Sequence, residues 1–109
     1  MAKRVLAYIK GTLHLKMHYR TRESNKGTSI LSGYVDSNYA NSKDRKSTTG
    51  FCFHLEGCLI VWCLKRQSTI ATFTTVAEYF TLYEATTEAV CLKTLLSDLH
   101  LVQGSLMII

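Results

Sequence analysis

The first third of the chain changes from a helical to an alternating pattern of hydrophobic residues. In residues 3–10 the apolar positions fall on one face of a short helix, and Gly11 follows as a C-terminal stop. Residues 13–20 alternate between apolar and polar side chains, which predicts a half-buried strand with one face in water. Residues 21–29 are polar and contain a glycine, so we expect a turn there.

The middle of the chain predicts a strand followed by a β-hairpin. Residues 30–37 form the first strand, and a polar, basic loop follows it. Residues 48–55 and 58–64 pair across a two-residue turn at 56–57. Both arms of this hairpin are apolar on both faces, which is typical of strands that are covered on each side. We therefore expect both arms to be central in a sheet, with Trp62 in the core.

From residue 75 to residue 99 the apolar period becomes helical. Thr74 or Thr75 can cap the start of this helix, and Glu78 lies near its first turn. Another apolar strand begins at residues 105–109. The expected fold class is therefore α/β, with antiparallel strands first, then a long helix and a stub of a further core strand. The apolar face predicted for the helix consists of Val76, Tyr79, Phe80, Tyr83, Val90, Leu92, Leu95, Leu96 and Leu99.

The composition describes one small folded domain with an uneven charge. The chain has 109 residues, of which 47% are hydrophobic, and a net charge of +5. Ten Lys or Arg and three Asp or Glu lie in residues 1–50, so the first half is strongly basic. A basic half suits a nucleic-acid backbone as partner, and the alternative is a solvated basic surface.

The sequence pattern shows no targeting signal. No apolar run is long enough to span a membrane, and residues 1–5 open an amphipathic helix rather than a signal peptide. The four cysteines form no CxxC pair and lie in apolar runs, so we expect reduced thiols. We therefore expect an intracellular protein, cytoplasmic or nuclear, that is not secreted and has no membrane partner.

Two carboxylates and a set of cations carry the candidate chemistry. Asp36 lies on a predicted strand and Glu78 near the start of the long helix, and two such carboxylates can begin a divalent-metal site. Taken alone, Asp36 also fits a turn or strand end, and Glu78 also fits the positive end of a helix dipole. The cations either contact a nucleic-acid backbone or solubilise loops. These candidates for nucleic-acid binding are Lys43, Arg45, Lys46, Lys65 and Arg66.

Five segments, in this order, resemble the ribonuclease H (RNase H) domain at the C-terminal end of the Pol polyprotein of copia-type LTR retrotransposons. Residues 3–12 (KRVLAYIKGT) resemble the segment that links the reverse transcriptase of that family to its RNase H. Residues 33–37 (GYVDS) resemble its first catalytic strand, and residues 44–51 (DRKSTTGF) match its next-strand signature. Residues 62–67 (WCLKRQ) fit its Trp-x-x-(Lys/Arg)-x-Gln run, and residues 74–79 (TTVAEY) are similar to its helix start.

The resemblance implies an RNase H-like mixed sheet and hydrolysis of the RNA strand of an RNA/DNA hybrid. By this likeness Asp36 is the first catalytic, metal-binding carboxylate and Glu78 the second, with Mg²⁺ (or Mn²⁺) as cofactor. Residues 1–12 would be the tail of the connecting segment, and residues 13–109 a partial RNase H-like domain. The implied partners are an RNA/DNA hybrid and the reverse transcriptase portion of the same polyprotein.

The chain departs from the family pattern mainly at its end. Asn38 and Tyr39 stand where the family has Asp and Trp. The strand that begins at residues 105–109 stops before the Asp-Asn pair of the family, so the sheet is expected to be truncated before the end of its fourth core strand. With two of four acidic ligands, we expect weak or absent Mg²⁺ binding and an inactive remnant. The alternatives are a non-catalytic nucleic-acid-binding or protein-interaction module, or a functionless transposon relic.

Overall fold

The computed structural model of the protein describes residues 1–20, 30–41, 43–101, 104 and 106–109. Within these residues, three strands lie between two helices, and a short strand follows the second helix. The elements, in chain order, are α1 (Ala2–Gly11), β1 (Leu31–Asn38), β2 (Thr48–Leu55), β3 (Cys58–Arg66), α2 (Thr74–Asp98) and β4 (Met107–Ile108).

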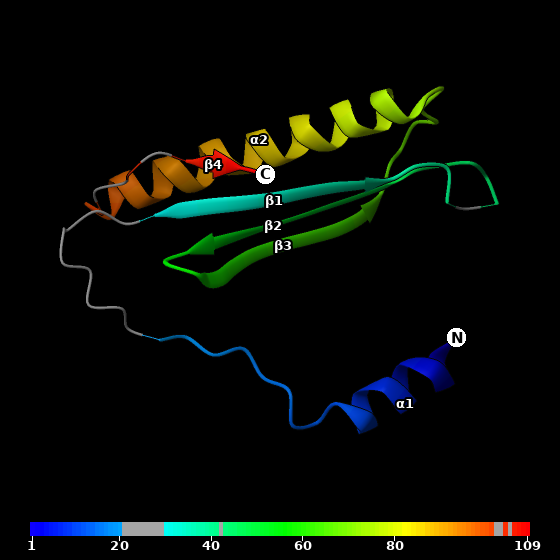
Figure 1. The fold of residues 1–109 in the computed structure, drawn as a ribbon, viewed down its shortest axis with the longest axis horizontal. Coiled ribbons are helices and arrows are strands. Elements are labelled where there is room, and N and C mark those ends of the chain that lie inside the picture. Colours follow the sequence, from blue (N-terminus) through cyan, green and yellow to red (C-terminus); the bar gives the residue numbers. More distant parts are fainter. Residues whose placement is uncertain (21–29, 42, 102–103, 105) are drawn as a thin grey trace.

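The described strands form one sheet in the order β3-β2-β1-β4 (Figure 1). β1, β2 and β3 are antiparallel neighbours, and the short β4 runs parallel to β1. α2 lies along one face of this sheet, where it contacts β1 and β2. These observations confirm the predicted α/β class, with three antiparallel strands, a long helix and a short fourth strand.

The β2–β3 hairpin forms as predicted, across a turn at Glu56 and Gly57. Both residues have positive φ angles, 53° and 77°, which is the combination of a type I′ turn and matches the twist of antiparallel strands. The Oε1 of Glu56 also accepts a hydrogen bond from the N–H of Ile30 at 2.7 Å. The turn therefore fixes the start of β1 as well as joining β2 to β3.

The side of α2 that packs on the sheet is made mainly of small residues. Its buried residues recur at a spacing of three or four, so they lie on one side of the helix. Small side chains let the helix axis lie close to the sheet, where Leu31 and Phe53 are buried at the centre of the core. The buried residues of α2 are Ala77, Thr81, Ala85, Ala89, Leu92 and Leu96.

Of the apolar face predicted for this helix, Leu92 and Leu96 are buried and Val76 is half-buried; the rest of the prediction is wrong. Tyr79 and Tyr83, for example, are 73% and 67% exposed. The helix carries large hydrophobic residues on several sides, so their period alone does not decide which side is buried. The predicted threonine cap is also wrong, because Phe73 is the N-cap residue and no side chain caps the helix.

β3 lies at the edge of the described sheet, so the prediction that both hairpin arms are central holds only for β2. Trp62, predicted to lie in the core, is 61% exposed, and Leu64 is exposed as well. α2 covers one face of the sheet only, and these two side chains alternate onto the other face.

The first twenty residues make few contacts with the sheet. α1 forms as predicted but has no buried residue and contacts no other described helix or strand. Residues 13–20 form no strand, and Leu13 is 77% exposed, so the strand prediction for this segment is wrong. A strand needs ladder hydrogen bonds from a neighbour, and no described strand pairs with this segment. The turn predicted at residues 21–29 lies outside the described residues.

Candidate functional site

Asp36 and Glu78 line one pocket. It has a volume of about 470 Å³ and is bounded by β1, by the first turns of α2 and by Ile108 and Ile109 at the end of the chain. Both acidic residues are exposed to solvent. Two carboxylates that are far apart in the sequence are thus brought to the same hollow in the surface.

The pocket begins where β1 loses its neighbour on the β4 side. β4 pairs only with the start of β1, and Ile109 adds backbone hydrogen bonds to Gly33 and Val35. Past Val35, no described strand continues on that side of β1. Exposure alternates along β1, with Val35 half-buried and Asp36 exposed, so their side chains leave the strand on opposite faces. Val35 packs against the core under α2, so Asp36 leaves β1 on the face that α2 does not cover and borders the pocket from that side of the open sheet edge.

The helical period places Glu78 on the opposite wall. Thr75, Glu78, Tyr79 and Leu82 all line the pocket, and their spacing of three and four puts them on one side of α2. Ala77 is completely buried against the sheet, and each following residue is turned by about 100° around the helix axis. Contact of Ala77 with the sheet therefore turns Glu78 toward the edge of β1.

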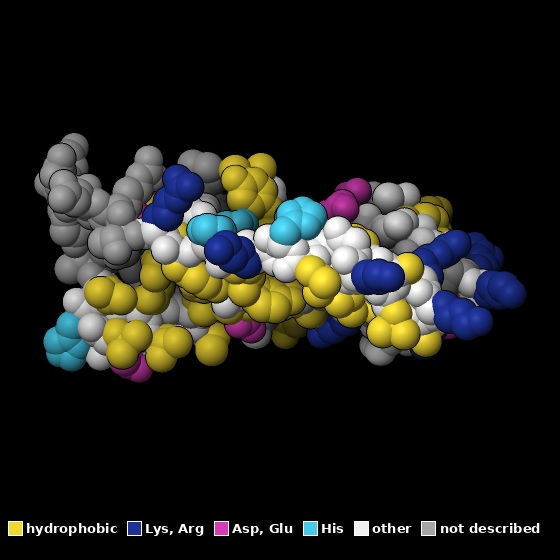
Figure 2. Space-filling view, turned by 90° about the horizontal axis from the view of Figure 1, so that it is seen from below, with side chains coloured by type: hydrophobic (Ala, Val, Ile, Leu, Met, Phe, Trp, Pro, Cys, Tyr) yellow, Lys and Arg dark blue, Asp and Glu magenta, His cyan; other side chains and the backbone are white. Residues whose placement is uncertain are grey.

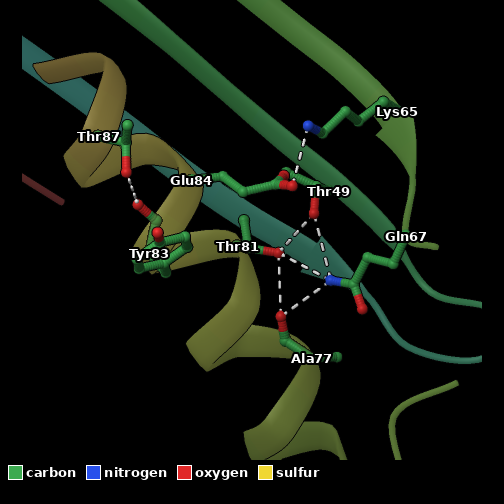
Figure 3. Close-up of polar contacts among 8 residues, drawn as sticks. All are labelled: Thr49, Lys65, Gln67, Ala77, Thr81, Tyr83, Glu84 and Thr87. Atoms are coloured by element: carbon green, nitrogen blue, oxygen red, sulfur yellow. Dashed lines mark hydrogen bonds and ion pairs between the residues drawn. The ribbon is translucent and has the colours of Figure 1, made fainter. Parts of the chain in front are cut away.

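A buried group of polar residues fixes the start of α2 against the sheet (Figure 3). The hydroxyls of Thr49 on β2 and Thr81 on α2 share a hydrogen bond of 3.1 Å. The Nε2 of Gln67 lies 3.2 Å from each hydroxyl and 3.0 Å from the carbonyl oxygen of Ala77. We term Thr49, Gln67, Ala77 and Thr81 the polar clamp. It joins the middle of the sheet, the segment after β3 and the first turns of α2.

Sequence reasoning missed the polar clamp and the related contacts of Ser47. Ser47 is fully buried; its hydroxyl accepts a hydrogen bond from the N–H of Ala40 at 3.1 Å, and its carbonyl accepts one from the N–H of Gln67 at 2.9 Å. Ser47, Thr49 and Gln67 all belong to the family-like segments, and here their contacts are structural. A signal was present, because polar residues next to apolar runs that become buried must find hydrogen-bond partners.

Two of the predicted nucleic-acid cations form ion pairs within the chain. The Nζ of Lys65 lies 2.9 Å from the Oε1 of Glu84 on α2, and Arg66 pairs with Asp44. The hydrogen bond that Lys65 donates to Glu84, together with the negative charge of Glu84, raises the pKa of Lys65 above its ordinary value. Because each of these cations has an acidic partner, they are weaker candidates for phosphate contact than the sequence suggested.

The other three predicted cations lie in the loop between β1 and β2. Lys43 and Arg45 are exposed there, and Lys46 is half-buried. Arg45 has a positive φ of 59°, so the loop turns sharply at this position. Figure 2 shows Lys and Arg side chains gathered at the right-hand end of the molecule, where Figure 1 places both this loop and the start of α1.

The carboxylates of the pocket suit one hydrated divalent ion better than a pair of ions. Mg²⁺ is commonly held by one or two carboxylates, with waters and substrate phosphates completing its coordination. Asp36 and Glu78 supply that number of carboxylates in the same pocket. Among the described residues, no three His, Cys, Asp or Glu side chains come together as a metal-binding group. These residues therefore do not fit a two-metal site, which needs more acidic ligands.

Two further observations concern the environment of the chain. All four cysteines are free thiols; Cys91 is exposed and the other three are half-buried. Within the described residues, no helix has both the length and the apolar character that a membrane span requires.

The chain is similar to a retrotransposon polyprotein and to two other proteins. It is 41% identical, over 83% of its length, to the Secreted RxLR effector protein 161 of Plasmopara viticola. It is 36% identical, over 93% of its length, to the Retrovirus-related Pol polyprotein from transposon TNT 1-94 of Nicotiana tabacum. It is 37% identical, over 72% of its length, to the Uncharacterized mitochondrial protein AtMg00810 of Arabidopsis thaliana.

The fold is α/β, and the similarities to the Pol polyprotein and to AtMg00810 support a transposon-related origin of the chain. The chain spans 61%, 7% and 32% of the lengths of these three relatives, in the same order, so each relative is considerably longer than the matched region. No family model matches the chain, and no solved structure matches it. One of the three relatives is the Pol polyprotein of a retrotransposon.

Proposed function

We propose that the chain is a remnant of the RNase H domain of a retrotransposon Pol polyprotein, with Asp36 and Glu78 as two of its metal-binding carboxylates. The observation that carries this proposal is the shared pocket, which joins a carboxylate on β1 to one near the start of α2. The antiparallel strand order with one long helix agrees with the mixed sheet that the motifs imply. The relation to the tobacco Pol polyprotein supports the origin.

The two carboxylates have a definite task in this proposal. A divalent ion bound between them would supply the chemistry of phosphodiester hydrolysis, namely an activated water and stabilisation of the leaving oxygen. The chain itself holds Asp36 at the open edge of β1, while the polar clamp turns Glu78 toward that edge. Both carboxylates are negative and only accept hydrogen bonds, so they repel a phosphate group. A phosphate can approach them only when a cation lies between the phosphate and the two carboxylates.

The 109 residues are proposed to be inactive alone, because two carboxylates cannot hold two ions. The test is incubation of the chain with a labelled RNA/DNA hybrid and Mg²⁺ or Mn²⁺, beside the Asp36→Asn variant. We expect no more cleavage from the chain than from the variant. Cleavage by the chain that the variant lacks would contradict the proposed inactivity.

The site itself is tested by metal binding, independently of cleavage. We expect Asp36→Asn and Glu78→Gln each to weaken Mn²⁺ binding, measured by calorimetry or by the electron-spin signal of free Mn²⁺. Glu88→Gln is the matched control, since this residue lies on the same helix but outside the pocket. Equal loss of affinity in the control, or none in the two site variants, would show that the pocket is not the metal site.

A non-catalytic nucleic-acid-binding module is the second candidate. It is favoured by the exposed cations Lys43 and Arg45 of the loop between β1 and β2. Phosphate contacts make affinity fall with salt concentration, by a slope that grows with the number of contacts. Replacement of both residues by glutamine should therefore flatten the salt dependence of hybrid binding. An unchanged slope would exclude this loop as the phosphate-binding surface.

A further inference from the structure

The sheet face that α2 leaves uncovered carries a row of aromatic side chains. Tyr34 of β1 pairs with Cys52 of β2, and Cys52 pairs with Trp62 of β3. Directly opposite residues of antiparallel strands project to the same face. This face lies opposite the buried Phe53, which is the next residue along β2. We term it the open face. By the strand register its members include Tyr34, Asp36, Asn38, Thr48, Gly50, Cys52, His54, Trp62 and Leu64.

The aromatic rings of the open face are held apart and exposed. Tyr34 is 49% exposed and Trp62 is 61% exposed. The ring of His54 meets the ring of Tyr34 edge-on, with centroids 5.7 Å apart, and so limits its movement. Since Tyr34 and Trp62 are two strands apart, their attachment points are separated by about 10 Å. Both rings therefore present surface to solvent without stacking on each other.

A second hollow lies beside this row. It has a volume of about 320 Å³ and is lined by residues that include Tyr34, Asp36, Gly50 and Cys52. Gly50 contributes no side chain, and a Cβ added there would lie 3.6 Å from the side chain of Leu64. Asp36 and Ile109 line this hollow and also the pocket that contains Glu78. The open face is therefore continuous with the candidate metal site.

The open face carries the carboxylate of Asp36, but the loop next to it supplies exposed cations, whereas the charge on α2 is negative. The last paired row of the face, Asn38 with Thr48, leads directly into the loop with the exposed Lys43 and Arg45. α2 also exposes aromatic rings, such as Tyr83, but its sequence holds four acidic residues and one lysine. Compared with α2, the open face combines rings on the sheet itself with neighbouring cations, which favours a polyanion that also has flat apolar groups.

We propose that the open face binds single-stranded nucleic acid, with bases stacked on Tyr34 and Trp62 and phosphates directed toward Lys43 and Arg45. Exposed aromatic rings on a sheet, beside cations that follow the backbone, are the features with which proteins hold unpaired bases. This binding mode goes beyond the proposed origin of the chain. It requires neither cleavage nor a bound metal ion, so it can be tested with metal removed.

Trp62 supplies the direct measurement, because it is the one tryptophan of the chain. In EDTA, titration with a short oligothymidylate should quench the emission of Trp62. An abasic strand of the same length carries the same phosphates without bases, and it should quench little. Equal quenching by both strands would show that phosphate alone is bound and would overturn the proposal, as would an absence of binding.

Variants locate the binding on this face. In the anisotropy of a labelled oligothymidylate, Tyr34→Leu and Trp62→Leu should each weaken binding at least about fivefold, the low end of base–aromatic stacking. Trp62→Phe keeps a ring and should restore most of the affinity. Tyr83→Leu is the matched control, an equally exposed ring on α2. Equal loss of affinity in the Tyr83→Leu control would overturn the proposal. So would Trp62 emission that changes with protein concentration alone, because that would indicate a second copy of the chain on this face.

Discussion

Replacement of Gly33 by alanine is a direct test of how closely the sheet and its core are packed. Gly33 on β1 lies opposite Phe53 on β2. A Cβ at this position would lie 2.5 Å from the Cε1 atom of Phe53, closer than non-bonded carbon atoms approach. The ring of Phe53 is completely buried under α2, so it cannot swing into solvent to make room. Overpacking of this kind costs about 1–3 kcal/mol.

We therefore expect Gly33→Ala to lower the free energy of unfolding by about 1–3 kcal/mol. For a domain of this size, each kcal/mol corresponds to a fall in Tm of about 4–8 °C. The measurement is urea and thermal unfolding followed by far-UV circular dichroism. A second change, Phe53→Leu in the same chain, should recover part of the loss, because a smaller side chain frees the space for the new methyl group.

Gly50→Ala provides the matched control on the neighbouring strand. A Cβ at Gly50 would meet its nearest atoms at 3.6 Å, which is ordinary van der Waals contact. The same chemical change should therefore leave stability nearly unaltered. If Gly33→Ala is as stable as the parent chain, or if Gly50→Ala loses as much as Gly33→Ala, the argument from close packing is wrong.

Two further predictions concern polar contacts. Gln67→Ala should destabilise the fold by about 1–3 kcal/mol through loss of the polar clamp, and hydrogen exchange in the first turns of α2 should accelerate; unchanged protection there would contradict a clamping role. Lys65→Met should cost less than about 1 kcal/mol at neutral pH, because the pair with Glu84 is half exposed. Pairing raises the pKa of Lys65 above 10.5, so its stabilisation is present below that pH and is lost as the pH rises through the raised value. An unfolding series in which this difference grows above pH 10.5 would contradict the sign.

The strands and the long helix could be predicted because their signals are local. The alternation of residues 30–37, the two-residue turn at 56–57 and the helical period after residue 75 are each contained in a short window. All three features are present in the structure, with boundaries that differ by one or two residues. Asp36 and Glu78 could likewise be named from short motifs, and the structure places both at one pocket.

Features that depend on contacts between distant segments could not be predicted in this way. Residues 13–20 have the period of a strand, but no described strand pairs with them. Trp62 lies in an apolar run, yet the edge position of β3 leaves it in solvent. The partners of Gln67 are on β2 and α2, and a local pattern does not reveal such pairs.

The small residues of α2 connect the stability of the fold to the geometry of the candidate site. Ala77 and Thr81 hold one side of the first turns to the sheet, while Glu78 and its neighbours line the pocket on another side. Burial of the large residues predicted from the period, such as Tyr79, would require the helix to rotate and to stand farther from β1. Rotation by one position would turn Glu78 by about 100°, away from the edge where Asp36 lies. The exposed aromatic rings of α2 and the shared pocket are therefore two consequences of the same close packing.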